Sequence, residues 1–161
     1  MVKIGLRLKA NLENVTNLRP DGEDFRWYLK VKCGNCNEES DKWIYVTQSE
    51  SLEIKGGRGT ANLVYKCKLC SREHHMDIIP ESIKSYNEDD QGKFKSVVQF
   101  DCRGMEPSSF SPRNGWSVDG LESGMPFTDV DLTEKEWADY DEKAKETVGI
   151  YELEHEFVRE R

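Results

Sequence analysis

Four cysteines are the residues of this sequence whose type and spacing point most directly to chemistry. They form two C-x-x-C pairs, Cys33 with Cys36 and Cys67 with Cys70, and thirty residues separate the pairs. Each pair can form a turn in which both sulfur atoms converge on one point. Two such turns side by side supply four thiolates in the tetrahedral arrangement that zinc prefers. The pattern therefore predicts one Zn²⁺ per chain, bound by all four cysteines.

We expect this zinc to be structural rather than catalytic. Four cysteine ligands leave no coordination position for water, whereas a catalytic zinc site keeps one open. Iron could occupy the same geometry. A thioredoxin-like redox pair is disfavoured because neither motif is followed by a helix or a βαβ pattern. Ordinary burial is also a poor explanation for two C-x-x-C pairs within one window of 38 residues.

The segments around the cysteines suit a metal site. Four thiolates and one divalent cation carry a net charge of about −2. Basic residues adjoin the cysteines in sequence and could offset this charge: Lys32, Lys42, Lys66, Lys68 and Arg72. Gly34 suits a tight turn around a metal, because such a turn often needs a backbone conformation that is costly for other residues. Between the pairs there is room for an extra hairpin with residues 56–59 (Gly-Gly-Arg-Gly) at its tip.

Other reactive side chains have simpler interpretations. His74 and His75 are adjacent, so on a strand at most one could face the metal. With four cysteines available, we expect both histidines at the surface. His155 lies on the apolar face of a strand and is interpreted as a core histidine, and Cys102 as a small apolar packing residue. No catalytic motif is present, so we expect no enzymatic activity.

Strands are the elements that must position the cysteines. Apolar residues alternate with polar ones, which is the period of a half-buried strand. Long runs of this kind are residues 4–12, 25–33, 94–102 and 151–157, and shorter ones are 42–47, 61–66 and 75–79. Each C-x-x-C pair follows one of these runs, as in a zinc ribbon.

Two further segments lack this alternation of apolar and polar residues. Residues 133–145 are the one plausible helix, with Thr133 as N-cap and Glu136 at the capping-box position. Residues 104–124 are rich in Pro, Ser and Gly and indicate a long irregular connection. The prediction for the whole chain is an all-β fold with at most one short helix.

An internal similarity suggests a duplication. A shift of 69 residues lays residues 25–33 on 94–102 and places Cys33 on Cys102. We therefore predict two similar lobes of β-sandwich or barrel type. Residues 1–80 would form the zinc-binding lobe, and residues 81–161 a second lobe without metal. The two would share a core and could count as a single domain; a chance likeness of two amphipathic strands is the alternative.

Charge and hydropathy restrict the partners and the location. The net charge is −8, and residues 76–161 alone hold ten basic and 21 acidic side chains, a net of −11. Such a surface repels phosphate backbones and disfavours nucleic-acid binding. No apolar run approaches the ~18 residues of a membrane span, and the N-terminus lacks the apolar region of a signal peptide. We expect a monomer in the cytoplasm, with access to the nucleus, where thiols stay reduced.

At these residues the sequence resembles the eukaryotic CXXC-motif-containing zinc-binding protein family. The resemblance spans nearly the full chain, in the stretches NLRPDGEDFRWYLKVKCGNC, SDKWIYV, KGGRG, KCKLCSRE, FDCRGMEP and DYDEKAKETVGIYE. It implies a mostly β protein of two similar lobes, the first holding zinc through Cys33, Cys36, Cys67 and Cys70. The family carries no established enzymatic activity, so the resemblance indicates the fold and the metal but not the biological task. The adjacent His74 and His75 depart from the family pattern.

Three functions are compatible with this reading. The first is a structural-zinc protein that acts through protein–protein contacts. The second is a metal-handling protein whose thiolates exchange metal with a partner. The third is a zinc ribbon that binds nucleic acid through its Lys-rich turns and Trp43 or Tyr45, against which the acidity of residues 76–161 argues.

Overall fold

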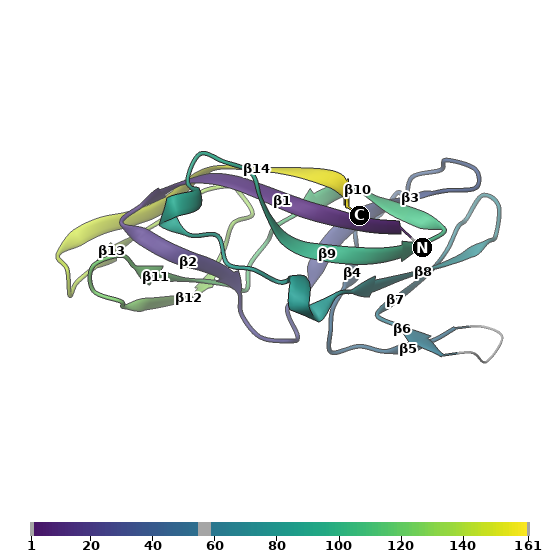
Figure 1. The fold of residues 1–161 in the computed structure, drawn as a ribbon, viewed down its shortest axis with the longest axis horizontal. Coiled ribbons are helices and arrows are strands. Elements are labelled where there is room, and N and C mark those ends of the chain that lie inside the picture. The colour runs from purple at the N-terminus through teal and green to yellow at the C-terminus, as the bar shows by residue number, and fades with distance from the viewer. Residues whose placement is uncertain (1, 55–58, 161) are drawn as a thin grey trace.

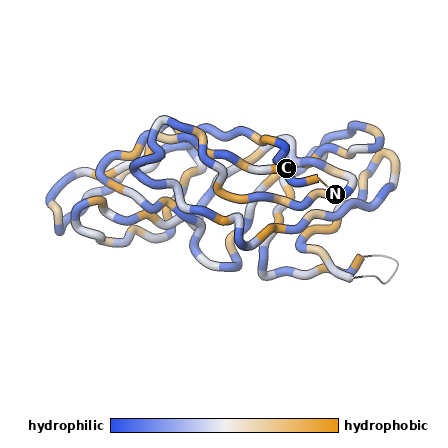
Figure 2. Tube along the Cα trace, in the orientation of Figure 1, coloured by the Kyte–Doolittle hydropathy of each residue, from blue (hydrophilic) through white to orange (hydrophobic). Residues whose placement is uncertain are grey.

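The computed structural model describes residues 2–54 and 59–160 and shows an elongated molecule built almost entirely of strands (Figure 1). Each of the four long alternating runs of the sequence coincides with a strand over most of its length, which confirms the all-β prediction. These strands are β1 (Val2–Glu13), β3 (Trp27–Cys33), β9 (Lys95–Arg103) and β14 (Glu146–Glu160). Figure 2 shows apolar and polar residues following one another along them, with the turns mostly polar.

The largest sheet has six antiparallel strands in the order β13-β14-β1-β9-β8-β7. Its remaining strands are β13 (Trp137–Asp141), β8 (Glu73–Ile78) and β7 (Leu63–Lys66). The central strand β1 pairs with β14 on one side and with β9 on the other. Because side chains alternate between the two faces, β1 buries Leu6, Leu8 and Ala10 against the core.

Two sheets of three strands complete the core. One has the order β10-β3-β4, with β10 (Met105–Ser111) and β4 (Ile44–Val46). The other has the order β12-β11-β2, with β12 (Pro126–Val130), β11 (Trp116–Gly120) and β2 (Val15–Pro20). Aromatic rings join the three sheets into one continuous hydrophobic core. Trp27 of β3 lies 6.2 Å from Phe100 of β9 and 5.7 Å from Trp116 of β11, centroid to centroid.

Residues 1–80 and 81–161 are interleaved in this architecture. Strand β1, from the first range, lies between β14 and β9, both from the second. The core likewise takes buried residues from both ranges, so the two ranges share it. The division into two lobes and the duplication stay predictions.

The predicted helix over residues 133–145 is wrong. This segment contains β13 and the turn that leads into β14, with Trp137 paired to Ile150 and Asp141 to Glu146. The carboxylate of Asp141 accepts the backbone N–H groups of Lys143 and Ala144, which stabilises a tight turn instead of a helix. Trp137 packs on Phe127 of β12, with ring centroids 5.4 Å apart, so tertiary contacts favour the strand.

The prediction of an irregular connection over residues 104–124 is also wrong. The segment contains all of β10 and β11, which bury Phe110, Trp116 and Val118. Pro107, which lacks a backbone N–H, is accommodated because β10 is an edge strand of its sheet. The register of β10 on β3 shifts between Pro107 and Ser109, and this shift breaks the alternation that a regular strand would show in the sequence.

The extra hairpin expected between the cysteine pairs is present. It consists of β5 (Leu52–Glu53) and β6 (Thr60–Ala61), with Leu52 opposite Ala61. Of the predicted tip, residues 56–58 lie outside the described residues. Two 3-10 turns, Pro80–Ser82 and Glu88–Asp90, precede β9. No helix in the described part of the chain has the length and hydropathy needed to cross a membrane.

Candidate metal centre

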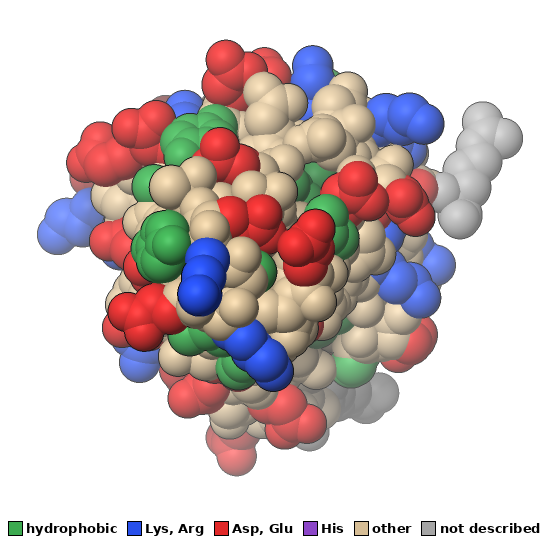
Figure 3. Space-filling view, turned by 90° about the vertical axis from the view of Figure 1, so that its left-hand side faces the viewer, with side chains coloured by type: hydrophobic (Ala, Val, Ile, Leu, Met, Phe, Trp, Pro, Cys, Tyr) green, Lys and Arg blue, Asp and Glu red, His purple; other side chains and the backbone are tan. Residues whose placement is uncertain are grey.

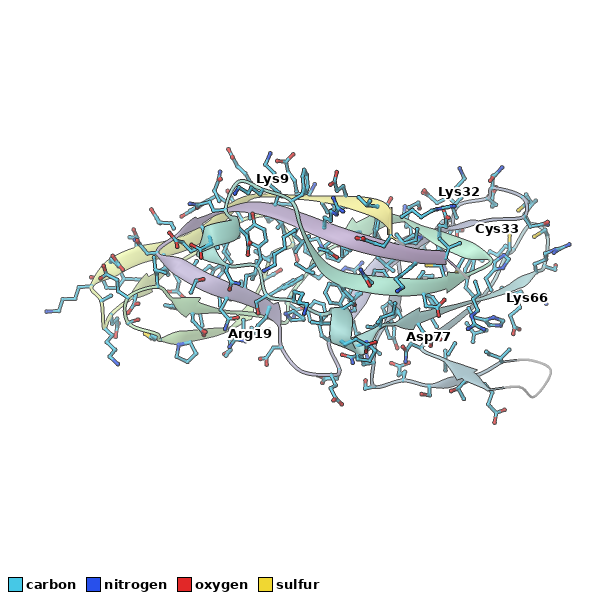
Figure 4. The ribbon with its side chains drawn as sticks, in the orientation of Figure 1. Lys9, Arg19, Lys32, Cys33, Lys66 and Asp77 are labelled. Atoms are coloured by element: carbon cyan, nitrogen blue, oxygen red, sulfur yellow. The ribbon has the colours of Figure 1, made fainter. Side chains whose placement is uncertain are left out.

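The two C-x-x-C pairs meet at one end of the molecule, where Figure 4 labels Cys33. Cys33 is the last residue of β3, and Cys67 directly follows β7. Both pairs form the same turn. The N–H of Asn37 donates to the carbonyl of Cys33, the N–H of Ser71 donates to the carbonyl of Cys67, and both hydrogen bonds are 2.9 Å long. Asn37 and Ser71 also share a left-handed backbone, with φ of 65° and 64°.

The structure brings together all four cysteines that the sequence singled out. Their sulfur atoms lie within 4.8 Å of one another. Cys33 Sγ is 3.7 Å from Cys70 Sγ, and Cys36 Sγ is 3.6 Å from Cys67 Sγ. A tetrahedral zinc site with Zn–S bonds of 2.3 Å has sulfur–sulfur distances of about 3.8 Å. The four thiols are therefore spaced closely enough to bind one zinc ion, and none of the chain's five cysteines, all described, is in a disulfide.

Gly34 is required for a different reason from the one the sequence suggested. The φ of Gly34 is not positive, so a left-handed backbone conformation does not explain why glycine is needed there. Instead, a Cβ at Gly34 would lie 2.9 Å from the carbonyl oxygen of Gly104. The N–H of Gly34 donates to that same carbonyl at 2.8 Å. The turn between β9 and β10 thus packs directly on the first cysteine turn.

The expectation that both histidines lie at the surface is wrong for His74. This residue is 4% exposed, and its Nε2 lies 3.0 Å from Cys33 Sγ. When Nε2 carries the proton, His74 donates a hydrogen bond to the Cys33 thiolate. Such a bond offsets part of the negative charge of a four-thiolate centre. An added Cβ at Gly104 would overlap His74 Nδ1, so Gly104 leaves the space in which the imidazole ring lies.

The sequence contained a signal for this position. Strand β8 buries His74, Met76 and Ile78, which are alternate residues. The apolar character of Met76 and Ile78 identifies the inward face, and His74 lies on it. His75 points to the other side, where its Nε2 is 3.5 Å from a carboxylate oxygen of Glu73.

The surroundings of the sulfur atoms differ. The backbone N–H of Arg72 and the side chain of Asn35 lower the pKa of Cys70 to about 6. The backbone N–H of Glu38 favours the Cys36 thiolate, but burial and the neighbouring sulfur atoms raise the pKa of Cys36 to about 12. Four touching sulfur atoms therefore do not become thiolates together unless a cation compensates their charge. This donor set fits a divalent metal ion.

Cys102 lies in the core as interpreted, whereas His155 is only partly buried and lies outside the buried core cluster. Cys102 is buried in the core, and desolvation raises its pKa to about 12, so it packs as an unreactive thiol. His155 is partly buried between the rings of Phe110 and Phe157, at centroid distances of 5.6 Å and 5.7 Å. Neither residue is among the four clustered ligands.

A β fold with a four-cysteine cluster places the chain among proteins with a tetrathiolate metal site. Comparison with known proteins identifies the family within this class. The family described as "CXXC motif containing zinc binding protein, eukaryotic" matches residues 5–158. The chain belongs to this family. A "CXXC motif containing zinc binding protein" of Bos taurus is 60% identical over 159 residues, which are 99% of each chain. These findings confirm the resemblance seen in the sequence.

Solved structures agree with the fold. The structure described as "Crystal Structure of C1orf123" is 58% identical and has a TM-score of 0.93, covering 98% of this chain and 99% of that one. A hypothetical protein from Plasmodium falciparum is 31% identical with a TM-score of 0.87, covering 98% of this chain and 100% of its own. The same arrangement of strands therefore persists at much lower sequence identity.

Proposed function

We propose that the chain binds one zinc ion through Cys33, Cys36, Cys67 and Cys70, and that this zinc is structural. The observation that carries the proposal is the set of four sulfur atoms within 4.8 Å of one another, presented by two turns of the same geometry. Zinc is the metal that such a closed set of thiolates suits best. The name of the family supports the same metal.

The location of the site suggests what the zinc does. Cys33 ends β3 of a three-stranded sheet, whereas Cys67 and Cys70 lie between β7 and β8 of the six-stranded sheet. A metal ion bound to both turns cross-links two sheets at the end of the molecule. The four ligands leave no open position for a substrate, so the proposal assigns the site no catalytic role. The protein would act as a monomer that offers a fixed surface to a protein partner.

Metal analysis tests the zinc assignment. The full chain is purified without added metal, and its zinc content is measured by inductively coupled plasma mass spectrometry and native mass spectrometry. One zinc per chain is expected, and Cys67→Ser should lose it while Cys102→Ser keeps it. Stoichiometric iron in place of zinc would overturn the assignment of the metal, and zinc retained by Cys67→Ser would overturn the ligand set.

Proximity labelling in cells tests the role in protein contacts. Proteins labelled by the wild-type chain but not by Cys67→Ser at equal abundance are then purified and tested for direct binding. At least one zinc-dependent binary complex is expected. If every labelled protein is shared between the wild type and the variant, the proposed role of zinc in presenting an interaction surface is wrong.

Metal exchange is the second candidate function, and one observation favours it. Cys36 and Cys70 are only partly buried, so a partner thiol could reach the metal from one side. The rate of zinc transfer to a competing chelator separates the two functions. A structural site should release zinc over hours, whereas an exchange site should release it within seconds when a thiol-rich acceptor is added.

A further inference from the structure

The outward face of the sheet β10-β3-β4 carries an unusual set of side chains. Along β3, Trp27, Leu29 and Val31 point into the core, so the residues between them point outward. The outward residues of β3, the end of the loop before β4, β4 itself and the segment after β10 form what we call the cation–aromatic face. It comprises Tyr28, Lys30, Lys32, Trp43, Tyr45 and Arg113.

The cations on this face lie over aromatic rings. The guanidinium of Arg113 is 3.8 Å from the ring centroid of Tyr28, and the ammonium of Lys30 is 5.3 Å from that of Trp43. Tyr28 itself lies opposite Tyr45, with centroids 5.8 Å apart. Stacking over a ring restrains a guanidinium while its in-plane N–H groups stay available to an anion. The face is therefore pre-organised to receive negative charge.

These cations have no carboxylate partner. Among the described residues, no acidic side chain lies within ion-pair distance of Lys30, Lys32 or Arg113. Glu106, which is opposite Lys32 on β10, is instead bound by Arg159 at 2.6 Å. By contrast, Arg7 and Lys9 of β1 form ion pairs with glutamates of β14. In a chain of net charge −8, three unpaired cations on one sheet face indicate a site for an anionic partner.

Negative charge lies around Lys32 and at the ends of the face, since Glu106 and Glu39 are both opposite Lys32 in the strand register. At the Tyr28 end of the face, Asp21 and Asp24 line a hollow together with Arg26 and Tyr28. These two carboxylates would repel an anionic ligand that extended beyond Tyr28. The hydroxyl of Tyr45 donates a hydrogen bond of 2.8 Å to the carboxylate of Glu50, which follows β4 in the chain. The end of the molecule opposite the cysteines, seen in Figure 3, is spread with acidic side chains. A long polyanion would meet all of these groups, whereas a short acidic segment would meet few of them.

We propose that the cation–aromatic face binds an acidic, extended peptide segment of a partner protein. The inference rests on the proposed function in one respect: zinc fixes Cys33, the residue next to Lys32, and so holds the end of β3. Alternate residues of an extended strand are about 6.7 Å apart. Acidic side chains at every second position of a bound peptide would therefore match Tyr28, Lys30 and Lys32 in spacing, with carboxylates on the cations and aliphatic atoms on the rings.

The test uses fluorescence anisotropy with the full-length, zinc-loaded chain. The probe is a fluorescein-labelled ten-residue peptide of alternating Glu and Thr, and its counterpart has Lys in place of Glu. A labelled ten-nucleotide uridine RNA is the third ligand. The variant Lys30→Gln/Lys32→Gln/Arg113→Gln removes three charges from the face. The matched control, Lys135→Gln/Lys143→Gln/Lys145→Gln, removes three exposed charges near the turns that flank β13. Zinc content is measured on every sample.

The wild type should bind the Glu peptide at low salt, with affinity falling as salt rises, and should not bind the Lys peptide. The face variant should lose at least tenfold in affinity, and the control less than twofold. Arg113→Lys should lose several-fold, because a point charge does not replace a stacked planar group. Equal losses in the face variant and the control, or RNA bound tenfold more tightly than the Glu peptide, would overturn the proposal.

Zinc removal separates this proposal from the proposed function. If the chelated protein binds the Glu peptide as tightly as the zinc-loaded one, the face is correct and the supporting role of zinc is wrong. If the face variant retains one zinc and no longer binds the Glu peptide, the zinc site and the peptide-binding face are both supported. If the zinc-loaded wild type shows no binding of the Glu peptide, the proposed docking surface is wrong while the zinc site stands.

Discussion

The substitution Cys67→Ser tests how much of the fold depends on the metal. Zinc bound at both turns closes the chain between Cys36 and Cys67 around thirty residues. For a cross-link that closes a loop of this length, chain entropy contributes about 4 kcal/mol to the free energy of unfolding. Domains of this size are stable by only about 5–15 kcal/mol. Loss of the cross-link should therefore remove a large part of the global stability.

The composition of the core indicates which part of the molecule should stay folded when the zinc is lost. Strand β1 pairs with both β14 and β9, and these three long strands bury a large share of the apolar core. The segment between the cysteine turns instead contains the short elements β4, β5, β6 and β7. We expect Cys67→Ser to lose hydrogen-exchange protection throughout residues 34–72, while β1, β9 and β14 stay protected.

Denaturant unfolding and hydrogen-exchange mass spectrometry measure the two effects. Cys102→Ser is the control, because it makes the same chemical change at a buried cysteine outside the cluster. It should keep the zinc and the protection of residues 34–72. The reasoning is refuted if Cys67→Ser loses zinc with less than about 1 kcal/mol of stability, or if it unfolds the whole chain at once.

Three further predictions follow from the geometry. His74→Gln should weaken zinc affinity by roughly 10-fold, because partners that bond to metal ligands have effects of this size; His75→Gln, measured in the same competition assay, should change it less than twofold. Gly104→Ala and Gly124→Ala both place a side chain at positive φ, which costs about 1–2 kcal/mol, but only at Gly104 would the Cβ overlap His74. Gly104→Ala should thus be the more destabilising in urea unfolding and should also lose zinc affinity, whereas equal effects would contradict the packing argument. Burial lowers the pKa of His155, so the folded state binds fewer protons than the unfolded state and stability should fall as the pH drops below about 6.5. His155→Leu should flatten this dependence in thermal melts from pH 7.5 to pH 5, and an unchanged slope would show that another group causes it.

The elements that sequence periodicity predicted are those in which one face alone is buried. In β1 and β3 the buried residues alternate with few interruptions, so their pattern in the sequence is the pattern of the structure. Strands β10 and β11 each contain a register shift against a neighbour. In β10 the shift moves the following residues to the opposite face, so the buried positions pass from Pro107 to Phe110 and lose the two-residue period. Strand β11 keeps Trp116, Val118 and Gly120 buried, but its five residues are too few for a long alternating run. Strand β1 also contains register shifts, yet its buried residues keep alternating over most of its length. Pro107 and the surrounding serines added a loop signal to a segment that is an edge strand.

The helix prediction failed because a local signal had two compatible structures. Thr133 and Glu136 satisfy a capping-box pattern, but the N–H of Thr133 donates to the side chain of Asp131 at 2.9 Å, in a short turn that precedes β13. Asp141, which a helix would expose, is buried and accepts hydrogen bonds from the next turn and from Ser123. Whether such a segment becomes a helix or a hairpin depends on partners distant in sequence, here Phe127 and Ile150.

In the metal centre, too, the features that depend on neighbouring residues could be predicted, and those that depend on residues distant in sequence could not. The ligands could be identified from residue type and spacing, because each turn is a local structure closed by its own hydrogen bonds. The residues that hold the first cysteine turn in place could not be identified in this way, because they belong to the turn between β9 and β10, about seventy residues after Cys33 in the chain. The Gly104 carbonyl binds the N–H of Gly34, and the absence of a side chain at Gly104 leaves room for His74 beside Cys33. The ligands therefore belong to residues 1–80, but the packing that orients Cys33 requires both halves of the chain.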